Sequence, residues 1–452
     1  MRRDLFELPV VCFCNIWYIN ANGNHTIAVK LLYKNYFEGY KLMEDRQSKY
    51  FELIICSGVN IQKGQLLVIR AQVENAPQVR ALAKEAYKAG AKKVIVRWDD
   101  DELERLTFMN GDDAIFDVCD SWLKTMMDQA SQEGAAFLTL VSSDPESLKG
   151  VDTDRVIRSR VAFNTALKAH RNRLMSNECR WCIAAVPSKA WAKRVFPLAK
   201  SGKKAVEKLW EAILAASRVD EDGDAIANWE AHTSLLKKRG DKMNRYNFSA
   251  LHLQSKNGTD LTVGLAPGHI WEGGVEVDTK GTVFSANIPT EELFTCPDRG
   301  RVDGVVKSTK PLIYQGNLID NFTIWFEKGK AVRVEAEKGQ DLLEKIIAVD
   351  EGAAYLGEIA LVPYHSPISQ SGVLFYNTLF DENAACHLAF GEAYPGTVKG
   401  ALGKSDKERI KMGVNKSGVH EDFMIGASDM TITGIKQDGK KVKVFKDGDF
   451  VF

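Results

Sequence analysis

The sequence has no excess of charge of either sign. Lys plus Arg and Asp plus Glu each number 60 among 452 residues, so the formal net charge is zero. Proteins that bind nucleic acid or an acidic membrane surface through electrostatics usually carry a basic excess. The balance therefore argues against both kinds of partner and favours small, chemically specific ones.

Long hydrophobic runs are also missing. No segment approaches the ~20 consecutive apolar residues of a membrane-spanning helix, so we expect no membrane anchor. Residues 8–19 are apolar and follow Arg2 and Arg3, as in a signal peptide, but no obvious small-residue cleavage pattern ends the run. Because Met43 opens a conventional start before an amphipathic pattern, we predict that residues 1–42 are an extension that the native protein lacks. A genuine extension or a targeting segment is the alternative.

Cysteine is too sparse for a disulfide framework. Eight cysteines are spread unevenly over the chain, whereas disulfide scaffolds concentrate theirs in short sequences. Cys179 and Cys182 form a CxxC pair, but the apolar run 183–186 follows it directly, so the pair leads into a strand. We interpret it as buried and structural, with a redox or metal-binding role as the alternative. This cysteine usage favours the reducing cytoplasm.

Phosphate-binding glycine motifs are absent as well, since the chain contains neither GxGxxG nor GxxxxGK[ST]. The nearest candidate loop, 60–64, precedes the first predicted strand. Nevertheless, a strand over 65–70, an Ala-rich helix over 77–89 and a strand over 93–98 predict a βαβ unit with parallel pairing. The alternation continues to about residue 215 and predicts an open α/β sheet with flanking helices. We expect this half to be a scaffold or lid and not a cofactor domain.

The second half has a different pattern. Residues 203–243 are predicted to be helical, and short alternating strands then flank Asn257-Gly258, a strong signal for a hairpin turn. Strands and glycine turns continue to the end of the chain. Because the chain is too long for one ordinary core, we predict two domains. They are an N-terminal α/β domain over 43–215 and a C-terminal, β-rich α+β metal-binding domain over 216–452.

Acids, histidines and a tyrosine recur in five stretches of the second half. These are Pro289-Thr290-Glu291-Glu292, Gly357-Glu358-Ile359-Ala360-Leu361-Val362, Asp381-Glu382-Asn383-Ala384-Ala385-Cys386-His387, Gly391-Glu392-Ala393-Tyr394 and His420-Glu421-Asp422. Alternate residues of a strand share one face, so His420 and Asp422 can reach the same point. Imidazole nitrogen and carboxylate oxygen together suit a divalent transition metal. The set is about what two adjacent ions need when one carboxylate bridges them.

Such a pair of ions, ~3.5–4 Å apart, makes a water nucleophilic and polarises a carbonyl or phosphoryl oxygen, so no serine or cysteine nucleophile is needed. A spare carboxylate can then carry the proton to the leaving group. Each residue also has a purely structural interpretation: a glutamate at a strand edge is usually solvated, Tyr394 can be a turn aromatic, and His387 a core histidine. It is the combination that indicates a metal site. Among the other histidines, His365 is the strongest additional candidate.

These segments resemble the thermophilic metallo-aminopeptidase family, that of aminopeptidases T and S. The motifs that carry the resemblance are Phe284-Ser285-Ala286-Asn287-Ile288-Pro289-Thr290-Glu291-Glu292, Cys296-Pro297-Asp298-Arg299, Gly357-Glu358-Ile359-Ala360, Asn383-Ala384-Ala385-Cys386-His387 and His420-Glu421-Asp422-Phe423-Met424-Ile425-Gly426. They follow the family's order and spacing over residues 43–452. The resemblance implies a two-domain homodimer with two divalent ions (Zn, Co, Mn or Mg) in its C-terminal domain. It also implies that the enzyme removes N-terminal residues from peptides with a free N-terminus.

The resemblance also assigns roles to individual residues. The family's metal ligands fall on Glu292, Glu358, His387, Tyr394, His420 and Asp422. We expect Glu358 to bridge the ions, Glu382 to act as a further ligand or as proton shuttle, and Tyr394 to bind a metal or to stabilise the oxyanion. Catalysis is thus assigned to Glu382, Tyr394 and Glu358. Glu291 is a candidate for binding the substrate amine, and Glu421 stands where the family pattern leads us to expect something apolar or small.

Two other functions remain as alternatives to a metal-dependent aminopeptidase. A dinuclear hydrolase of phosphate esters would need basic residues around the metals, and Arg299 and Arg301 follow the first acidic motif. A non-enzymatic peptide-binding protein would carry structural metals or would have lost them. Because every ligand position holds the expected residue type, loss of the site is disfavoured.

Overall fold

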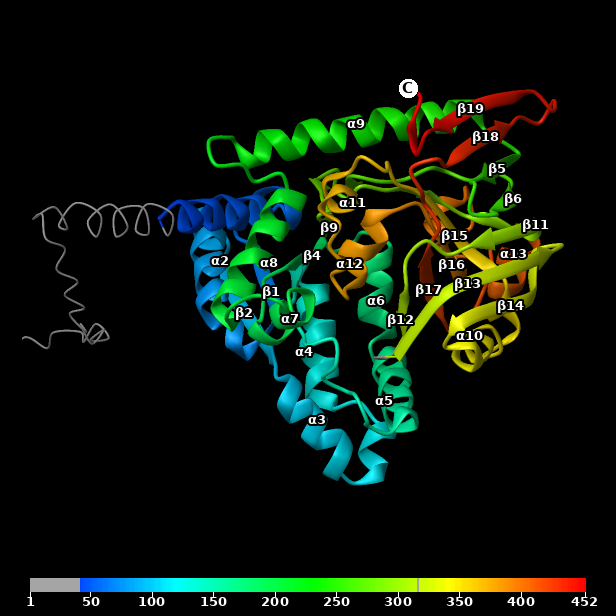
Figure 1. Ribbon diagram of the computed structural model, residues 1–452. Coiled ribbons are helices and arrows are strands. Elements are labelled where there is room, and N and C mark those ends of the chain that lie inside the picture. Colours follow the sequence, from blue (N-terminus) through cyan, green and yellow to red (C-terminus); the bar gives the residue numbers. More distant parts are fainter. Residues whose placement is uncertain (1–40, 315–316) are drawn as a thin grey trace, which may run out of the picture. The chain divides into compact units, whose positions relative to one another are not determined.

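The computed structural model describes residues 41–314 and 317–452, so the predicted extension 1–42 lies almost wholly outside the described part. The chain divides into two compact units, residues 1–47 and 48–452. In the first unit, the described residues 41–47 are helical. The second unit holds all remaining elements (Figure 1). Among the described residues, no helix combines the length and the apolar character that crossing a bilayer requires.

A five-stranded parallel sheet occupies the first part of the second unit, with strand order β2-β1-β3-β4-β9. Its strands are β1 (Leu66–Gln72), β2 (Lys93–Asp99), β3 (Ala136–Val141), β4 (Trp181–Ala185) and β9 (Asn287–Ile288). The intervening helices are α2 (Ala76–Lys88), α3 (Asp101–Asn110), α4 (Ser121–Gln132), α5 (Thr153–Ala166), α6 (Lys168–Met175), α7 (Lys189–Val195), α8 (Gly202–Ala216) and α9 (Ala225–Tyr246). Helices on the faces of a parallel sheet explain the continuous apolar runs of its strands. The predicted α/β sheet is confirmed.

The last strand of this sheet comes from the second half of the sequence. Strand β9 pairs in parallel with β4, where Ile183 lies opposite Asn287 and Ala184 lies opposite Ile288. Residues 289–292 follow β9 directly and contain the first predicted acidic motif. The first predicted ligand, Glu292, is therefore attached to the edge of the α/β sheet.

The rest of the chain is mainly antiparallel. A nine-stranded sheet has the order β12-β13-β11-β6-β5-β18-β19-β20, with β14 paired to β13. Its strands are β5 (Ala250–Gln254), β6 (Asp260–Leu265), β11 (Pro297–Lys307), β12 (Leu312–Tyr314), β13 (Asn317–Glu327), β14 (Lys330–Lys338), β18 (Thr431–Ile435), β19 (Lys441–Lys446) and β20 (Asp449–Phe450). The predicted hairpin at Asn257-Gly258 joins β5 to β6, and Gly258 has φ +109°, which glycine adopts without strain. β7 (Glu276–Val277) and β8 (Val283–Phe284) form a separate pair.

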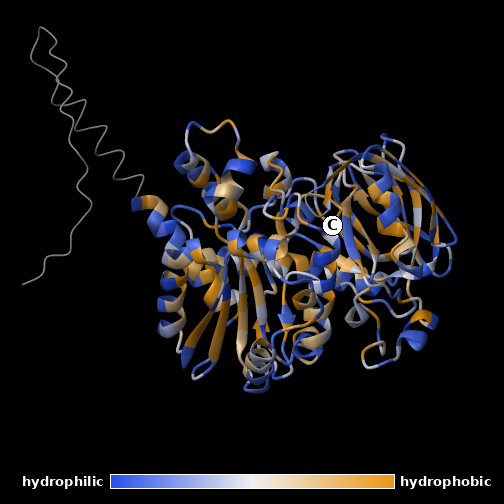
Figure 2. Ribbon diagram, turned by 90° about the horizontal axis from the view of Figure 1, so that it is seen from below, coloured by the Kyte–Doolittle hydropathy of each residue, from blue (hydrophilic) through white to orange (hydrophobic). Residues whose placement is uncertain are grey.

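A four-stranded sheet, β10-β15-β16-β17, packs one face onto this large sheet. Its strands are β10 (Leu293–Thr295), β15 (Leu356–Leu361), β16 (His387–Gly391) and β17 (His420–Met424), and the nearby helices are α10 (Gln340–Ile347), α11 (Pro367–Ser371), α12 (Thr378–Asp381) and α13 (Asp406–Lys411). Buried side chains from both sheets form one core, so hydrophobic residues concentrate in the strands (Figure 2). The mixed fold with a parallel and an antiparallel part is confirmed, while the division into domains at residue 215 stays a prediction.

Candidate metal centre

One face of the four-stranded sheet carries most of the predicted ligands. Ala389 in the centre of β16 lies opposite both Glu358 of β15 and Asp422 of β17. His387 stands two residues from Ala389 along β16, and His420 stands two residues from Asp422 along β17. Opposite residues and alternate residues share a face. The four side chains therefore project to the same side, and the small Ala389 leaves room between them.

The other face of the same strands is apolar. Leu388, Phe390 and Phe423 alternate with the predicted ligands and belong to the core shared with the nine-stranded sheet. A slip of one residue in the register would turn the charged groups into this apolar core and the hydrophobic side chains onto the ligand face. Glu421 lies opposite Phe390, on the face away from the predicted ligands, so this unexpected carboxylate does not enter the cluster.

A β-bulge at Gly357 turns Glu358 onto the ligand face. Between the pairs Leu356–Phe390 and Glu358–Ala389, strand β15 contains one residue more than β16. Without the bulge, Glu358 would lie opposite Leu388 of β16, and its side chain would face the core. Bulges commonly redirect side chains near functional sites. The position of the central carboxylate thus depends on this glycine.

We expect Gly357→Ala to destabilise the fold and to disorganise the site. A Cβ at Gly357 would lie 2.2 Å from the carbonyl oxygen of Glu392, which no methyl group can approach. Overpacking of this kind costs about 1–3 kcal/mol, and urea unfolding measures it. The matched control is Gly300→Ala, because a Cβ there would have its nearest contact at 3.7 Å, in ordinary van der Waals range. Equal stability of the two variants would contradict the importance of the bulge.

The imidazoles and carboxylates form two overlapping groups. His387 Nε2 lies 3.2 Å from Glu292 Oε2 and 3.5 Å from Glu358 Oε1. His420 Nε2 lies 3.6 Å from Glu358 Oε2 and 3.6 Å from Asp422 Oδ1. In each group, the possible ligand atoms lie within 4.8 Å of one another. Glu358 belongs to both groups and directs a different oxygen to each histidine.

Both imidazoles are oriented by backbone carbonyl groups. His387 Nδ1 lies 3.1 Å from the carbonyl oxygen of Ala385, and His420 Nδ1 lies 2.7 Å from that of Glu392. A carbonyl only accepts, so Nδ1 carries a proton and Nε2 of each ring faces carboxylate oxygens. Either a proton on Nε2 or a metal ion between Nε2 and the carboxylates satisfies this arrangement. Histidines that bind metals are held in this way, so the residues fit a metal ion.

The electrostatics of the cluster agree with a site for cations. Burial alone lowers the pKa of His420, but the nearby carboxylates of Asp422 and Glu358 raise it to about 10. Burial raises the pKa of Glu358, and it raises that of Glu382 well above the usual range, where the neighbouring carboxylates add to the effect. Asp422 Oδ1 is buried and has no hydrogen-bond partner among the described residues. The site therefore needs bound protons or metal ions to balance its negative charge.

Two further predicted residues border the cluster. Glu382 begins the short 3-10 turn Glu382–Ala384, and its Oε1 accepts a hydrogen bond of 3.4 Å from Asn383 Nδ2. The ring of Tyr394 lies beside that of His420, with 5.0 Å between centroids, and the residue is 41% exposed. Partial burial and the carboxylates of Glu358 and Asp422 raise the pKa of the Tyr394 phenol well above its usual value. The tyrosine therefore stays protonated at neutral pH and can donate a hydrogen bond.

Other candidates have different partners. Glu291 forms a close ion pair with Arg218, which occupies its carboxylate and leaves it less suited to bind a substrate amine. His365 is exposed and pairs with Asp449 of β20, outside both groups of possible ligands. Cys179 and Cys182 are both buried and free, as the structural interpretation predicted.

The two arginines that supported the alternative function, a phosphate-ester hydrolase, also have other partners. Arg299 binds Asn415 and Glu351 and lies over the ring of Tyr355. Arg301 donates to the carbonyl oxygen of Ser249. Within the described residues, neither guanidinium forms an ion pair with the cluster's carboxylates, and both have partners that a phosphate group would have to displace.

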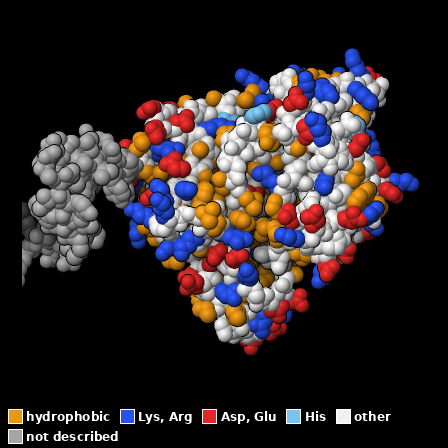
Figure 3. Space-filling view, in the orientation of Figure 1, with side chains coloured by type: hydrophobic (Ala, Val, Ile, Leu, Met, Phe, Trp, Pro, Cys, Tyr) orange, Lys and Arg blue, Asp and Glu red, His pale blue; other side chains and the backbone are white. Residues whose placement is uncertain are grey.

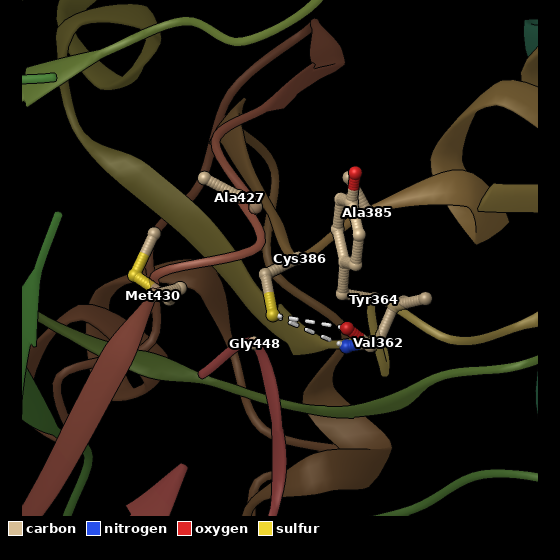
Figure 4. Close-up of a pocket in the computed structure, with 8 residues that line it drawn as sticks. Val362, Tyr364, Ala385, Cys386, Ala427, Met430 and Gly448 are labelled. Carbon is tan, nitrogen blue, oxygen red and sulfur yellow. Dashed lines mark hydrogen bonds between the residues drawn. The ribbon is translucent and has the colours of Figure 1, made fainter. Parts of the chain in front are cut away.

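A small pocket lies next to Cys386, the residue before His387 (Figure 4). The thiol donates to the carbonyl oxygen of Val362 and accepts from its N–H, both at 3.3 Å. Burial raises the pKa of Cys386 to about 11. The residues that line the pocket are uncharged: Val362, Tyr364, Ala385, Cys386, Gly426, Ala427, Met430 and Gly448. Because the thiol is buried and neutral, Cys386 is a packing residue next to His387 and not a nucleophile.

Sequence reasoning assigned no role to three residues around the centre, namely Gly357, Arg218 and Asn383, although Gly357 and Asn383 stand in the quoted motifs. The bulge at Gly357 has only a weak signal, a glycine inside a strand pattern. Arg218 and Asn383 act through contacts between segments far apart in the chain. No local pattern reveals such contacts.

The fold and the paired groups of carboxylates and imidazoles define a metal-dependent enzyme. The chain matches the model of the thermophilic metalloprotease (M29) family over residues 43–450. Aminopeptidase AmpS of Bacillus subtilis (strain 168) is 45% identical over 403 residues, which cover 89% of this chain and 98% of that protein. Aminopeptidase T of Thermus aquaticus is 41% identical over 404 residues, with coverage of 89% and 98%.

A solved structure supports the same relationship. Wild-type AmpT from Thermus thermophilus superimposes with a TM-score of 0.85 at 39% identity, covering 90% of this chain and 100% of that chain. The chain belongs to the thermophilic metalloprotease (M29) family, and the resemblance that its motifs indicated is confirmed. The prediction of a metal-dependent peptidase is confirmed with it.

Proposed function

We propose that this protein is an aminopeptidase that holds two divalent ions and hydrolyses the first peptide bond of short peptides. The observation that carries the proposal is Glu358, whose two oxygens face two different histidines. Glu292 and His387 would hold one ion with Glu358 Oε1, and His420 and Asp422 the other with Oε2. Two divalent cations would balance four carboxylates, namely Glu292, Glu358, Glu382 and Asp422.

The reaction needs a nucleophile, a proton carrier and a donor to the oxyanion. Two adjacent ions supply an acidified water and a polarised carbonyl. Glu382 lies beside the carboxylates of the cluster, so with both ions bound its carboxylate would be placed to take the water's proton and deliver it to the leaving amine. The phenol of Tyr394, which stays protonated, can donate a hydrogen bond to the oxygen of the attacked carbonyl. Tyr394 as a metal ligand remains the alternative role.

The proposal includes a homodimer in the cytoplasm. In favour of the dimer, large hydrophobic side chains are exposed around α3 and the start of α4, where a second copy could cover them. They are Leu103, Leu106, Met109, Val118 and Trp122, with exposures from 54% to 66%. Hydrophobic side chains also gather near the middle of the face shown in Figure 3. We infer the cytoplasmic location from the sparse cysteines, of which the six in the described part of the chain are unpaired.

Chelation tests the function. We expect EDTA to abolish hydrolysis of Leu-p-nitroanilide, and added cobalt or zinc to restore it, because the attacking water depends on the ions. N-acetyl-Leu-p-nitroanilide, which lacks the free amine, should not be cleaved. Undiminished hydrolysis in excess chelator would refute the metal mechanism. Turnover of bis-p-nitrophenyl phosphate in preference to the anilide would favour the phosphate-ester alternative.

A further inference from the structure

A buried ion pair anchors the segment that presents Glu292. Arg218 Nη2 donates a hydrogen bond of 2.9 Å to Glu291 Oε2, and Nη1 lies 2.7 Å from Oε1 in an ion-pair contact without a hydrogen bond. The Glu291 side chain is only 3% exposed. Because Glu291 immediately precedes Glu292, the pair fixes the backbone next to a proposed ligand.

The backbone of Arg218 supports a specific role for its side chain. The residue follows Ser217, the C-cap of α8, and has φ +59°, in the left-handed region. Glycine is the usual residue at this position after a helix, because a side chain there costs conformational energy. An arginine in this conformation is expected where its side chain is needed, and here the guanidinium reaches Glu291.

A second anchor connects the same segment to Glu382. The side chain of Asn383 is fully buried, and its Oδ1 accepts the backbone N–H of Glu291 at 2.7 Å. Its Nδ2 donates to the carbonyl oxygen of Leu379 at 2.9 Å and to Glu382 Oε1 at 3.4 Å. One amide therefore contacts both the segment that carries Glu292 and the proposed proton carrier.

A third contact comes from α9. The carbonyl oxygen of Thr290 lies 2.8 Å from His232 Nε2, which donates to it. Residues 290 and 291 are thus bound by side chains from the loop after α8, from α9 and from the turn after α12. None of these side chains belongs to the two groups of possible metal ligands.

We infer that Arg218, Glu291 and Asn383 are positioning residues that fix Glu292 and Glu382 relative to each other in the metal centre. The inference rests on the proposed function and goes beyond it, since these side chains hold neither ion. A buried ion pair is weak support for stability, because desolvation offsets its attraction. Groups that orient metal ligands typically change metal affinity or activity by about 10–100-fold when removed.

The test compares two double variants. Arg218→Gln with Glu291→Gln removes the proposed pair without leaving an unpaired buried charge. The control, Arg180→Gln with Asp278→Asn, removes another buried ion pair, in which both side chains are 4% exposed. Zinc affinity is measured by chelator competition, kcat at saturating zinc, and stability by thermal unfolding. We expect similar losses of stability, but an about 10–100-fold loss of zinc affinity and kcat only in the first variant.

Two milder variants keep the test decisive if the first variant unfolds. Arg218→Lys keeps the charge but cannot contact both carboxylate oxygens with two nitrogens, and we expect several-fold weaker zinc binding at near wild-type stability. Asn383→Leu should lower kcat at least tenfold at saturating zinc. Wild-type zinc affinity and kcat in all three variants would overturn the inference. Zinc affinity is measured without substrate, so a failure of the proposed peptidase activity would be recognised separately.

Discussion

Replacing Glu358 by glutamine should remove the bound metal and the activity together. Glu358 is 5% exposed, and each of its oxygens lies within 3.6 Å of a different histidine. An amide keeps the shape but offers one neutral oxygen, so neither ion would retain a charged shared ligand. Metal-ion catalysis is worth several kcal/mol, so kcat/KM should fall by about 10³-fold or more. Metal analysis and Leu-p-nitroanilide kinetics on the same sample measure both losses.

Glu421→Gln is the matched control for this variant. Glu421 lies between His420 and Asp422 in the same strand, but the pleat turns its side chain to the other face. We expect wild-type metal content and kcat/KM within about twofold of wild type, as for substitutions away from a site. If Glu358→Gln instead kept two ions and full turnover, the assignment of the bridging ligand would be wrong.

Replacing Glu382 by glutamine should separate proton transfer from metal binding. We propose that its carboxylate carries the proton from the water to the departing amine, a contribution of about 10²–10⁴-fold. Glutamine cannot carry a proton, so kcat should fall by that factor while both ions stay bound. Metal analysis beside steady-state kinetics decides the matter. Loss of an ion in this variant would make Glu382 a ligand and leave the proton carrier unidentified.

The chemistry of the centre was accessible from the sequence because residue type and strand alternation are local properties. His420 and Asp422 share a face whenever their segment is a strand, and the structure has that strand. Glu358 is different, because its face depends on a bulge. The pattern of residues 356–361 alone is equally compatible with a regular strand whose glutamate faces the core.

Contacts between segments that are distant in the sequence limited how much of the fold could be predicted. The sequence predicts a strand over 282–288, but it does not show that Asn287 and Ile288, the residues of β9, complete the parallel sheet beside β4. Arg218 likewise has no local signal, since its partner Glu291 is 73 residues away. Such contacts follow from the packing of whole elements, which sequence periodicity does not encode.

The number of ions per chain tests the central claim most directly. Metal-free protein, prepared with chelator and dialysed, is titrated with zinc or cobalt while bound metal and hydrolysis of Leu-p-nitroanilide are followed together. Our account predicts two equivalents per chain, no activity without metal, and full activity when both positions are filled. One equivalent or none at full activity would contradict it.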